Sequence, residues 1–165
     1  MLALGIDPGS AICGYGIVDM QGNHYQAICS GAVQTSPKIS MPERLQLIYR
    51  ELSQVIEKYH PERMGIEKLF FNRNVTSAIA VAQARGIVLL TAADHDLPIS
   101  EFTPLEVKQA VVGYGKATKS QVIYMTQKLL NLSEKPHLDD IADALAIAIC
   151  TLNSCSSRAM WEKSL

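Results

Sequence analysis

Apolar residues dominate three segments near the N-terminus, each of a length typical of a β-strand. The segment Leu2–Asp7 is apolar up to its final residue, and Pro8-Gly9 then turns the chain. Two further segments, about Cys13–Met20 and about His24–Val33, flank a Gln-Gly-Asn sequence at 21–23 that suits a tight turn. We therefore predict three strands, of which the second and third form an antiparallel hairpin.

Farther along the chain, apolar positions recur at helical spacing. One stripe begins after Pro42, which suits the first turn of a helix, and ends before Pro61; it consists of Leu45, Ile48, Leu52, Val55 and Tyr59. A second segment, about Val75–Asp94, is apolar around most of its circumference, although Gln83 and Arg85 in its middle argue against a membrane span. We expect this helix to cover the sheet with one face and to meet a second subunit with another.

The rest of the chain supplies further strands and helices. Strands are predicted for Met64–Glu67 and Leu97–Thr103, and helices for Pro104 to about Val112, for about Ser120–Leu130 and after His137. The last helix has a core stripe of Ile141, Leu145, Ala148 and Leu152. We therefore predict one α/β domain over residues 1–152, with a mixed central sheet of an antiparallel hairpin plus parallel strands, flanked by helices. The Ser-rich residues 153–165 are expected to form a flexible C-terminal tail, in which the role of Trp161 stays open.

Composition adds two constraints. The formal net charge is −1, so a DNA-binding surface would require Lys and Arg to be gathered on one face. The cysteines have no CxxC spacing and no neighbouring histidine, which argues against a zinc site; they are Cys13, Cys29, Cys150 and Cys155. Because the N-terminus leads directly into a strand without a basic segment, we expect a reduced, cytoplasmic location.

Four carboxylates occur where strands and a helix could bring them to one point. Asp7 and Glu67 each end an apolar strand, whereas Asp140 and Asp143 share one face of the last helix. Acids clustered in a half-buried place repel one another unless a cation neutralises them, and Mg²⁺ prefers such oxygen ligands. Each acid alone could instead be a turn residue, a strand-end charge or a helix cap.

Five ordered blocks around these acids resemble the RuvC family of Holliday-junction resolvases, from about Leu2 to about Leu152. The blocks are Gly5-Ile6-Asp7-Pro8-Gly9-Ser10, Glu67-Lys68-Leu69-Phe70, Gln83-Ala84-Arg85-Gly86, Lys108-Gln109-Ala110-Val111-Val112-Gly113 and Asp140-Ile141-Ala142-Asp143-Ala144-Leu145-Ala146. The resemblance implies a ribonuclease H-like fold and a metal-dependent endonuclease. Such an enzyme resolves four-way junction DNA by paired symmetric nicks in strands of like polarity, during recombination and repair.

The resemblance also assigns roles to the acids. Asp7, Glu67, Asp140 and Asp143 become the catalytic, metal-binding residues, with two Mg²⁺ per subunit expected and Mn²⁺ able to substitute. Asp139 adjoins the third acid, and helical spacing alone leaves it open as a ligand. We interpret Asp139 as lying near the N-cap of the last helix, where a short acid accepts backbone N–H groups.

Further residues are candidates for contact with DNA. By matching position, Phe70 would stack on a base that unpairs at the junction, and Arg73 follows it in the same loop. Lys108 and Lys119 match family positions near the cleaved strand, whereas Lys116 is either a DNA contact or a solvated lysine. The Gly-Lys pair before Ala117 is not a nucleotide-binding P-loop, because Ala replaces residues that this motif requires.

The resemblance implies a homodimer and, as partners, the RuvA and RuvB branch-migration complex, with no membrane contact. Ala78, Ala82 and Gly86 form a ridge of small residues at four-residue spacing, which we predict to lie in the dimer interface. The alternatives are another ribonuclease H-like nuclease, including the RuvX type, and a junction-binding module whose acids are structural. An ATPase of the actin and sugar-kinase type would need a longer chain.

Overall fold

The computed structural model describes the backbone of residues 1–68 and 75–162, and the side chains of residues 1–68 and 78–155. Within these residues the chain forms five strands and five helices. They are β1 (Leu2–Asp7), β2 (Ile12–Gln21), β3 (His24–Gln34), α1 (Met41–Tyr59), β4 (Arg63–Glu67), α2 (Val75–Asp94), β5 (Ile99–Phe102), α3 (Pro104–Val112), α4 (Lys119–Leu129) and α5 (Asp139–Glu162).

The strands form one mixed sheet, as the sequence predicted, in the order β3-β2-β1-β4-β5. β3, β2 and β1 pair antiparallel, whereas β1, β4 and β5 pair parallel. The sheet therefore changes from antiparallel to parallel pairing at β1. The hairpin of β2 and β3 is confirmed, and so is the parallel half that is reached through helices.

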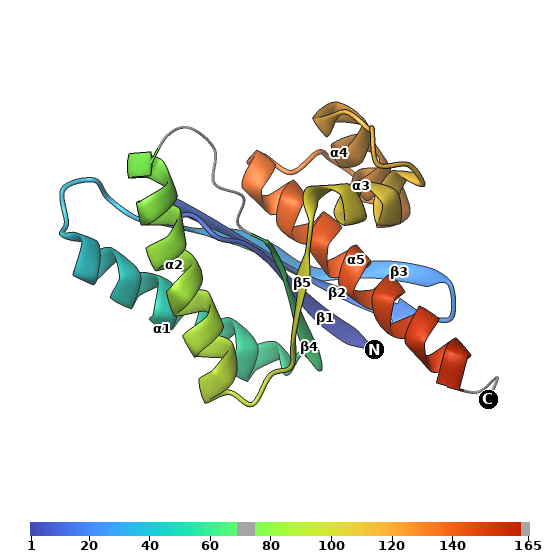
Figure 1. The fold of residues 1–165 in the computed structure, drawn as a ribbon, viewed down its shortest axis with the longest axis horizontal. Coiled ribbons are helices and arrows are strands. Elements are labelled where there is room, and N and C mark those ends of the chain that lie inside the picture. The colour runs from blue at the N-terminus through green and yellow to red at the C-terminus, as the bar shows by residue number, and fades with distance from the viewer. Residues whose placement is uncertain (69–74, 163–165) are drawn as a thin grey trace.

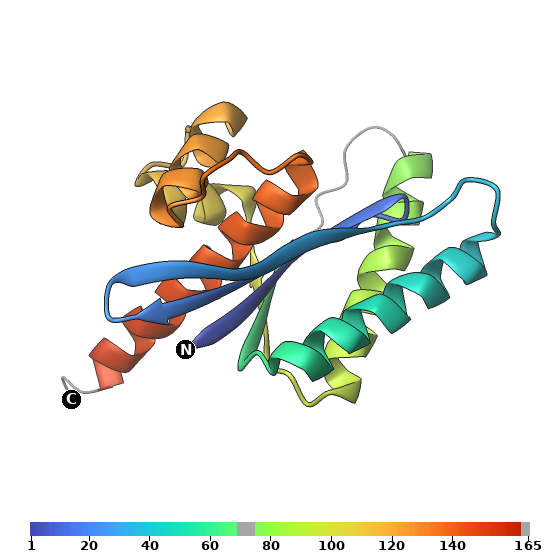
Figure 2. The same ribbon diagram turned by 180° about the vertical axis from the view of Figure 1, so that it is seen from behind.

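Helices cover both faces of the sheet (Figures 1 and 2). α1 and α2 lie on one face and pack against the side chains of Leu4, Ile6 and Ile66. α3, α4 and α5 lie on the other face, and α5 crosses β1, β2 and β4. Because side chains alternate between the faces of a strand, the sheet divides the hydrophobic core into two halves.

α5 lies so close to the sheet that some strand positions have room only for glycine. A Cβ atom added to Gly5 on β1 would come within 2.0 Å of the carbonyl oxygen of Ala144. A Cβ atom added to Gly65 on β4 would come within 2.0 Å of the Thr151 hydroxyl. The missing side chains thus let the helix backbone rest directly on the strands.

β5 is shorter than the predicted strand Leu97–Thr103. The N–H of Leu97 donates to the carbonyl of Ala92 at 2.9 Å and so closes the end of α2. Thr103 is the N-cap of α3, where its hydroxyl accepts a backbone N–H of the first turn at 3.2 Å. Both ends of the predicted strand therefore belong to neighbouring helices.

The last helix also differs from the prediction of a flexible tail from Asn153, because its backbone continues to Glu162. The Asn153 side chain donates to the carbonyl of Ala110 on α3 at 3.2 Å and accepts from the hydroxyl of Tyr25 on β3. The Ser154 hydroxyl donates within the helix, to the carbonyl of Thr151 at 2.8 Å. The contacts of Asn153 join distant parts of the chain, so a Ser-rich composition could not indicate them.

The close contact of α5 with the sheet predicts that Gly5→Ala destabilises the protein more than Gly65→Ala does. The new methyl at position 5 meets helix backbone, whereas the one at position 65 meets the Thr151 side chain first. Overpacking of this kind costs roughly 1–3 kcal/mol, which urea unfolding would measure. Combining Gly65→Ala with Thr151→Ala should recover part of the loss. Equal stability of Gly5→Ala and the wild type would contradict the contact.

Candidate active site

Asp7 and Glu67 stand side by side at the carboxyl ends of neighbouring strands. They follow Ile6 and Ile66, which are paired in the parallel register of β1 and β4. Each acid lies two residues after a glycine that faces α5, so alternation along the strand directs both side chains to the α5 face. Strand pairing therefore places two of the predicted acids under the same helix.

The other two acids come from the first turns of α5. Gly14 on β2 pairs directly with Asp7, and a Cβ atom added to Gly14 would come within 2.2 Å of the backbone oxygen of Asp140. Asp140, in the first turn of α5, thus lies beside Asp7. Asp143 lies on the same helix and shares with Glu67 the lining of a cavity of about 270 Å³. The structure brings together all four acids that the sequence predicted.

The pKa values of three of these acids reflect their burial and mutual repulsion. The pKa of Asp7 is raised to about 7, first by burial and then by the charges of Asp143, Asp140 and Glu67. Burial also raises the pKa of Glu67 and of Asp143, and in each case another of these acids adds to the effect. The cluster therefore holds more negative charge than its surroundings stabilise.

The donor set suits a hard divalent cation. All four groups are carboxylates, which are the ligands that Mg²⁺ and Mn²⁺ take in proteins, and a bound cation would offset the repulsion among them. In the described parts of the chain, no group of three or more His, Cys, Asp or Glu side chains is close enough together to hold a metal ion as it stands. The acids that would hold the cation are thus near one another, but they are not arranged as ligands around one ion.

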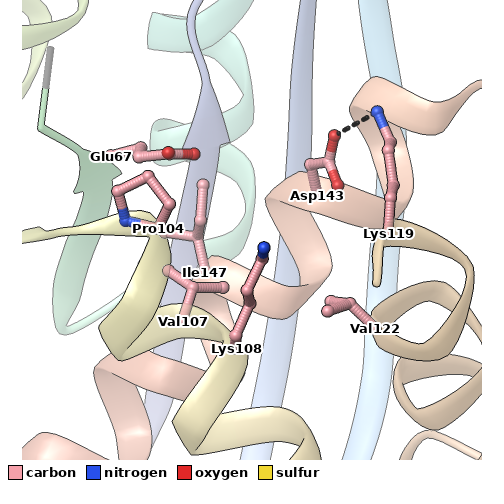
Figure 3. A pocket seen from close by; sticks show the side chains of 8 residues that line it. All are labelled: Glu67, Pro104, Val107, Lys108, Lys119, Val122, Asp143 and Ile147. Carbon is pink, nitrogen blue, oxygen red and sulfur yellow. Dashed lines mark ion pairs between the residues drawn. The ribbon is translucent and has the colours of Figure 1, made fainter. Parts of the chain in front are cut away.

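Two lysines border the same cavity (Figure 3). The ammonium of Lys119 lies 3.0 Å from a carboxylate oxygen of Asp143, on the side of the cavity opposite Glu67. Burial lowers the pKa of Lys119, but the hydrogen bond and charge of Asp143 outweigh burial and raise it. Lys108 on α3 lowers the pKa of Glu67 by its charge, although burial dominates there. Both lysines are therefore positive charges beside the acids.

Asp139 is placed differently from the four acids. Its half-exposed carboxylate forms ion pairs with Lys119 at 3.5 Å and with Lys135 at 3.6 Å. It is the first residue of α5, which agrees with an interpretation near the N-cap. It is not among the charges that raise the pKa of Asp7.

The remaining candidates for DNA contact are Lys116, Phe70 and Arg73. Lys116 is exposed between α3 and α4 and is not one of the residues that line the cavity. Phe70 and Arg73 lie outside the described residues. Their predicted roles remain predictions.

The outward face of α2 is apolar but is centred beside the predicted ridge. Ile79 and Leu90 are 56% and 50% exposed, and Gly86 lies between them with open space around it. Ala78 and Ala82 are only partly exposed, at the margin of this stripe. Among the described residues, no helix is both long enough and apolar enough to cross a membrane.

Arg85 is a site residue that the sequence analysis did not assign. Its side chain is only 13% exposed, although it lies on an otherwise apolar helix. Its Nε donates to the backbone carbonyl of Glu67 at 3.4 Å. The available signal was the presence of a charged residue in the middle of an apolar segment.

Comparison with known proteins identifies relatives of this chain. Residues 3–151 match the family model described as Crossover junction endodeoxyribonuclease RuvC. The protein of that name from Alkaliphilus oremlandii is 53% identical over 162 residues, which cover 98% of this chain and 99% of the relative. The one from Halothermothrix orenii is 51% identical over 161 residues, 98% of each chain. The structure of Thermus thermophilus RuvC in complex with Holliday junction substrate matches with a TM-score of 0.89 at 34% identity, covering 94% of both chains.

The raised pKa of Asp7 predicts that the metal-free protein loses stability as pH rises. Between the ordinary pKa of 3.8 and the folded value of about 7, the folded state binds more protons than the unfolded state. Thermal unfolding in a chelator should therefore show a higher midpoint at about pH 5 than at about pH 8. Asp7→Asn should flatten this dependence, and Mg²⁺ should raise the midpoint most at the higher pH. An Asp7→Asn profile as steep as the wild type would refute the assignment.

Proposed function

The chain belongs to the RuvC family of crossover junction endodeoxyribonucleases, and we propose that it resolves Holliday junctions at the cluster of Asp7, Glu67, Asp140 and Asp143. The reaction is hydrolysis of phosphodiester bonds by paired symmetric nicks in strands of like polarity. The observation that supports this site is the convergence of acids from β1, β4 and α5: burial and the charges of the neighbouring acids together raise the pKa of Asp7 to about 7. A structural cluster in a non-catalytic module would have no need of such repulsion.

The acids would hold the metal ions of a metal-dependent nuclease. Asp7 lies between Glu67 on one side and the acids of α5 on the other, so it is the central ligand of the set. Two Mg²⁺ ions per subunit, for which Mn²⁺ can substitute, would activate the attacking water and neutralise charge on the leaving oxygen. The assignment of individual acids to individual ions is left open.

The lysines have a complementary role. Without a cation, Lys119 partly neutralises Asp143, from which its ammonium is 3.0 Å away. If Asp143 held a cation, that ammonium would be free to contact the oxygens of a phosphate. Lys108 borders the same cavity, and together the two lysines would stabilise the negative charge that develops on the phosphate during hydrolysis. Phe70, Arg73 and Lys116 remain our candidates for further contacts with junction DNA.

The wider assembly is also part of the proposal. Two cuts in opposite arms are produced most simply by a two-fold homodimer, which presents two identical sites. The apolar face of α2, with Ile79, Gly86 and Leu90 at its centre and Ala78 and Ala82 at its margin, would form the interface. We place the enzyme in the cytoplasm with RuvA and RuvB as partners. The chain would form a single nuclease domain, which includes the part of α5 beyond residue 152.

Asp7→Asn should abolish junction cleavage while leaving junction binding intact. The amide has the same shape as the carboxylate but is a weaker metal ligand, and the surface that meets DNA is unchanged. The nicking rate in Mg²⁺ should fall by at least about 100-fold, the upper end of losses caused by residues that only support ligands. A gel assay on four-way DNA would measure both rate and affinity. Most of the rate surviving would refute the site.

Asp139→Asn and Asp140→Asn provide a matched pair at adjacent positions. Asp140 lies beside Asp7, whereas Asp139 is exposed and paired with Lys119 and Lys135. We expect Asp140→Asn to lose nearly all nicking and Asp139→Asn to keep most of it. The opposite order would show that Asp139 is the ligand.

Leu90→Glu should convert the dimer into monomers. A charge at the centre of an apolar interface would be buried without a partner, a cost of several kcal/mol. Light scattering at micromolar concentration would measure the mass of each variant. Ile28→Glu on β3 is the control, because Ile28 is similarly exposed but lies away from α2. A monomeric wild type, or a dimeric Leu90→Glu protein, would contradict the proposed interface.

A further inference from the structure

The Arg85 side chain on α2 is mostly buried, and it points in a different direction from the side chains next to it in the sequence. Gln83 and Gly86 are exposed, and Ala84 is fully buried in the core between α2 and the sheet. The Arg85 side chain is 13% exposed, so its guanidinium has lost most of its water. A buried guanidinium is stable only when protein groups replace that water. In this protein, two groups replace that water around Arg85.

Those groups belong to the two adjacent parallel strands, β4 and β5. The Nη2 of Arg85 forms an ion pair with Glu101 on β5, and its Nε donates to the carbonyl of Glu67 at the end of β4, 3.4 Å away. Glu101 pairs in register with Ile66, whose side chain packs in the core on the α2 face, and so it faces α2 as well. One planar guanidinium thus joins α2 to both strands.

The bond to Glu67 completes the fixation of one peptide unit. The carbonyl of Glu67 accepts from Arg85, and the N–H of Lys68, in the same peptide unit, donates to the carbonyl of Phe102 at 2.7 Å. A planar peptide held at both polar atoms cannot rotate, which fixes the backbone angle ψ of Glu67. The direction of the Cα–Cβ bond, from which the Glu67 side chain extends toward the other acids, is constrained as well.

We propose that Arg85 is a positioning residue, which orients Glu67 in the active site and ties that orientation to the position of α2. The role rests on the proposed function, since Glu67 is one of the four acids. It gives a purpose to the charged residue in the Gln83-Ala84-Arg85-Gly86 block. It also connects the helix that carries the proposed dimer face with the strand that ends at a catalytic acid.

Three variants separate the bond to Glu67 from the ion pair with Glu101. Arg85→Gln removes both interactions. Glu101→Gln removes the charge of the partner but keeps an acceptor for Arg85 and leaves the bond to Glu67 in place. Arg85→Lys keeps a positive charge, but a single ammonium does not reproduce the fork that reaches two acceptors. The measurements are Mn²⁺ affinity of the DNA-free protein by calorimetry, junction affinity in a chelator, melting temperature and nicking rate in saturating Mg²⁺.

Arg85→Gln should lower the nicking rate and the Mn²⁺ affinity by roughly 10–100-fold, the range for residues that orient a metal ligand, with unchanged junction affinity. Glu101→Gln should stay near the wild type in all of these, and Arg85→Lys should fall between. A Glu101→Gln protein as defective as Arg85→Gln would overturn the proposal in favour of the ion pair. Wild-type Mn²⁺ affinity in a folded Arg85→Gln protein would also overturn it. If the wild type itself cut no junction, the proposed function would fail, and Mn²⁺ affinity would still decide the role of Arg85.

Discussion

The close contact between α5 and the sheet is the constraint on which the rest of the structure depends. Glycines on β1, β2 and β4 let the helix backbone rest on the strands, with Gly14 directly beneath Asp140. A larger side chain at these positions would lift the helix and carry Asp140 and Asp143 away from the two strand acids. Gly5 on β1 and Gly65 on β4 lie two residues before Asp7 and Glu67, so each acid faces the same side of the sheet as its glycine. The strand glycines thus determine both how α5 packs on the sheet and where the four acids meet.

In this arrangement, the carboxylates that the proposed function requires also destabilise the folded state. A buried cluster of carboxylates opposes folding, as the raised pKa values of Asp7, Glu67 and Asp143 indicate. Lys119 relieves only part of the repulsion among the carboxylates, because it forms ion pairs with Asp143 and Asp139 at the N-terminal end of α5. The large apolar cores on both sides of the sheet offset the remaining cost. A cation is therefore favoured by the site before any substrate binds.

The sequence predicted most of the fold, and the reason is visible in particular residues. Local signals such as the apolar strand before Asp7 and the proline that opens α3 specify elements with little help from the rest of the chain. Predictions were wrong where a contact with a distant part of the chain determines the local structure, as at Asn153, whose side chain bonds to β3 and α3. Arg85 was missed for the same reason, because its partners Glu67 and Glu101 lie on other elements. We predicted the convergence of the acids from family resemblance. Its physical cause is the register of the strands and the contact of α5 with the sheet.

The position of Asp7 on β1 also has a consequence for the folding of the sheet. A slip of one residue in the pairing of β1 would turn Asp7 toward the α1 and α2 layer and bring Ile6 under α5, where only Gly5 fits. The slipped pairing would bury a charge in an apolar layer and drive a branched side chain into a helix backbone. Competing registers are therefore penalised on both faces at once, and the residue that we propose to serve hydrolysis also selects the native alignment of the chain.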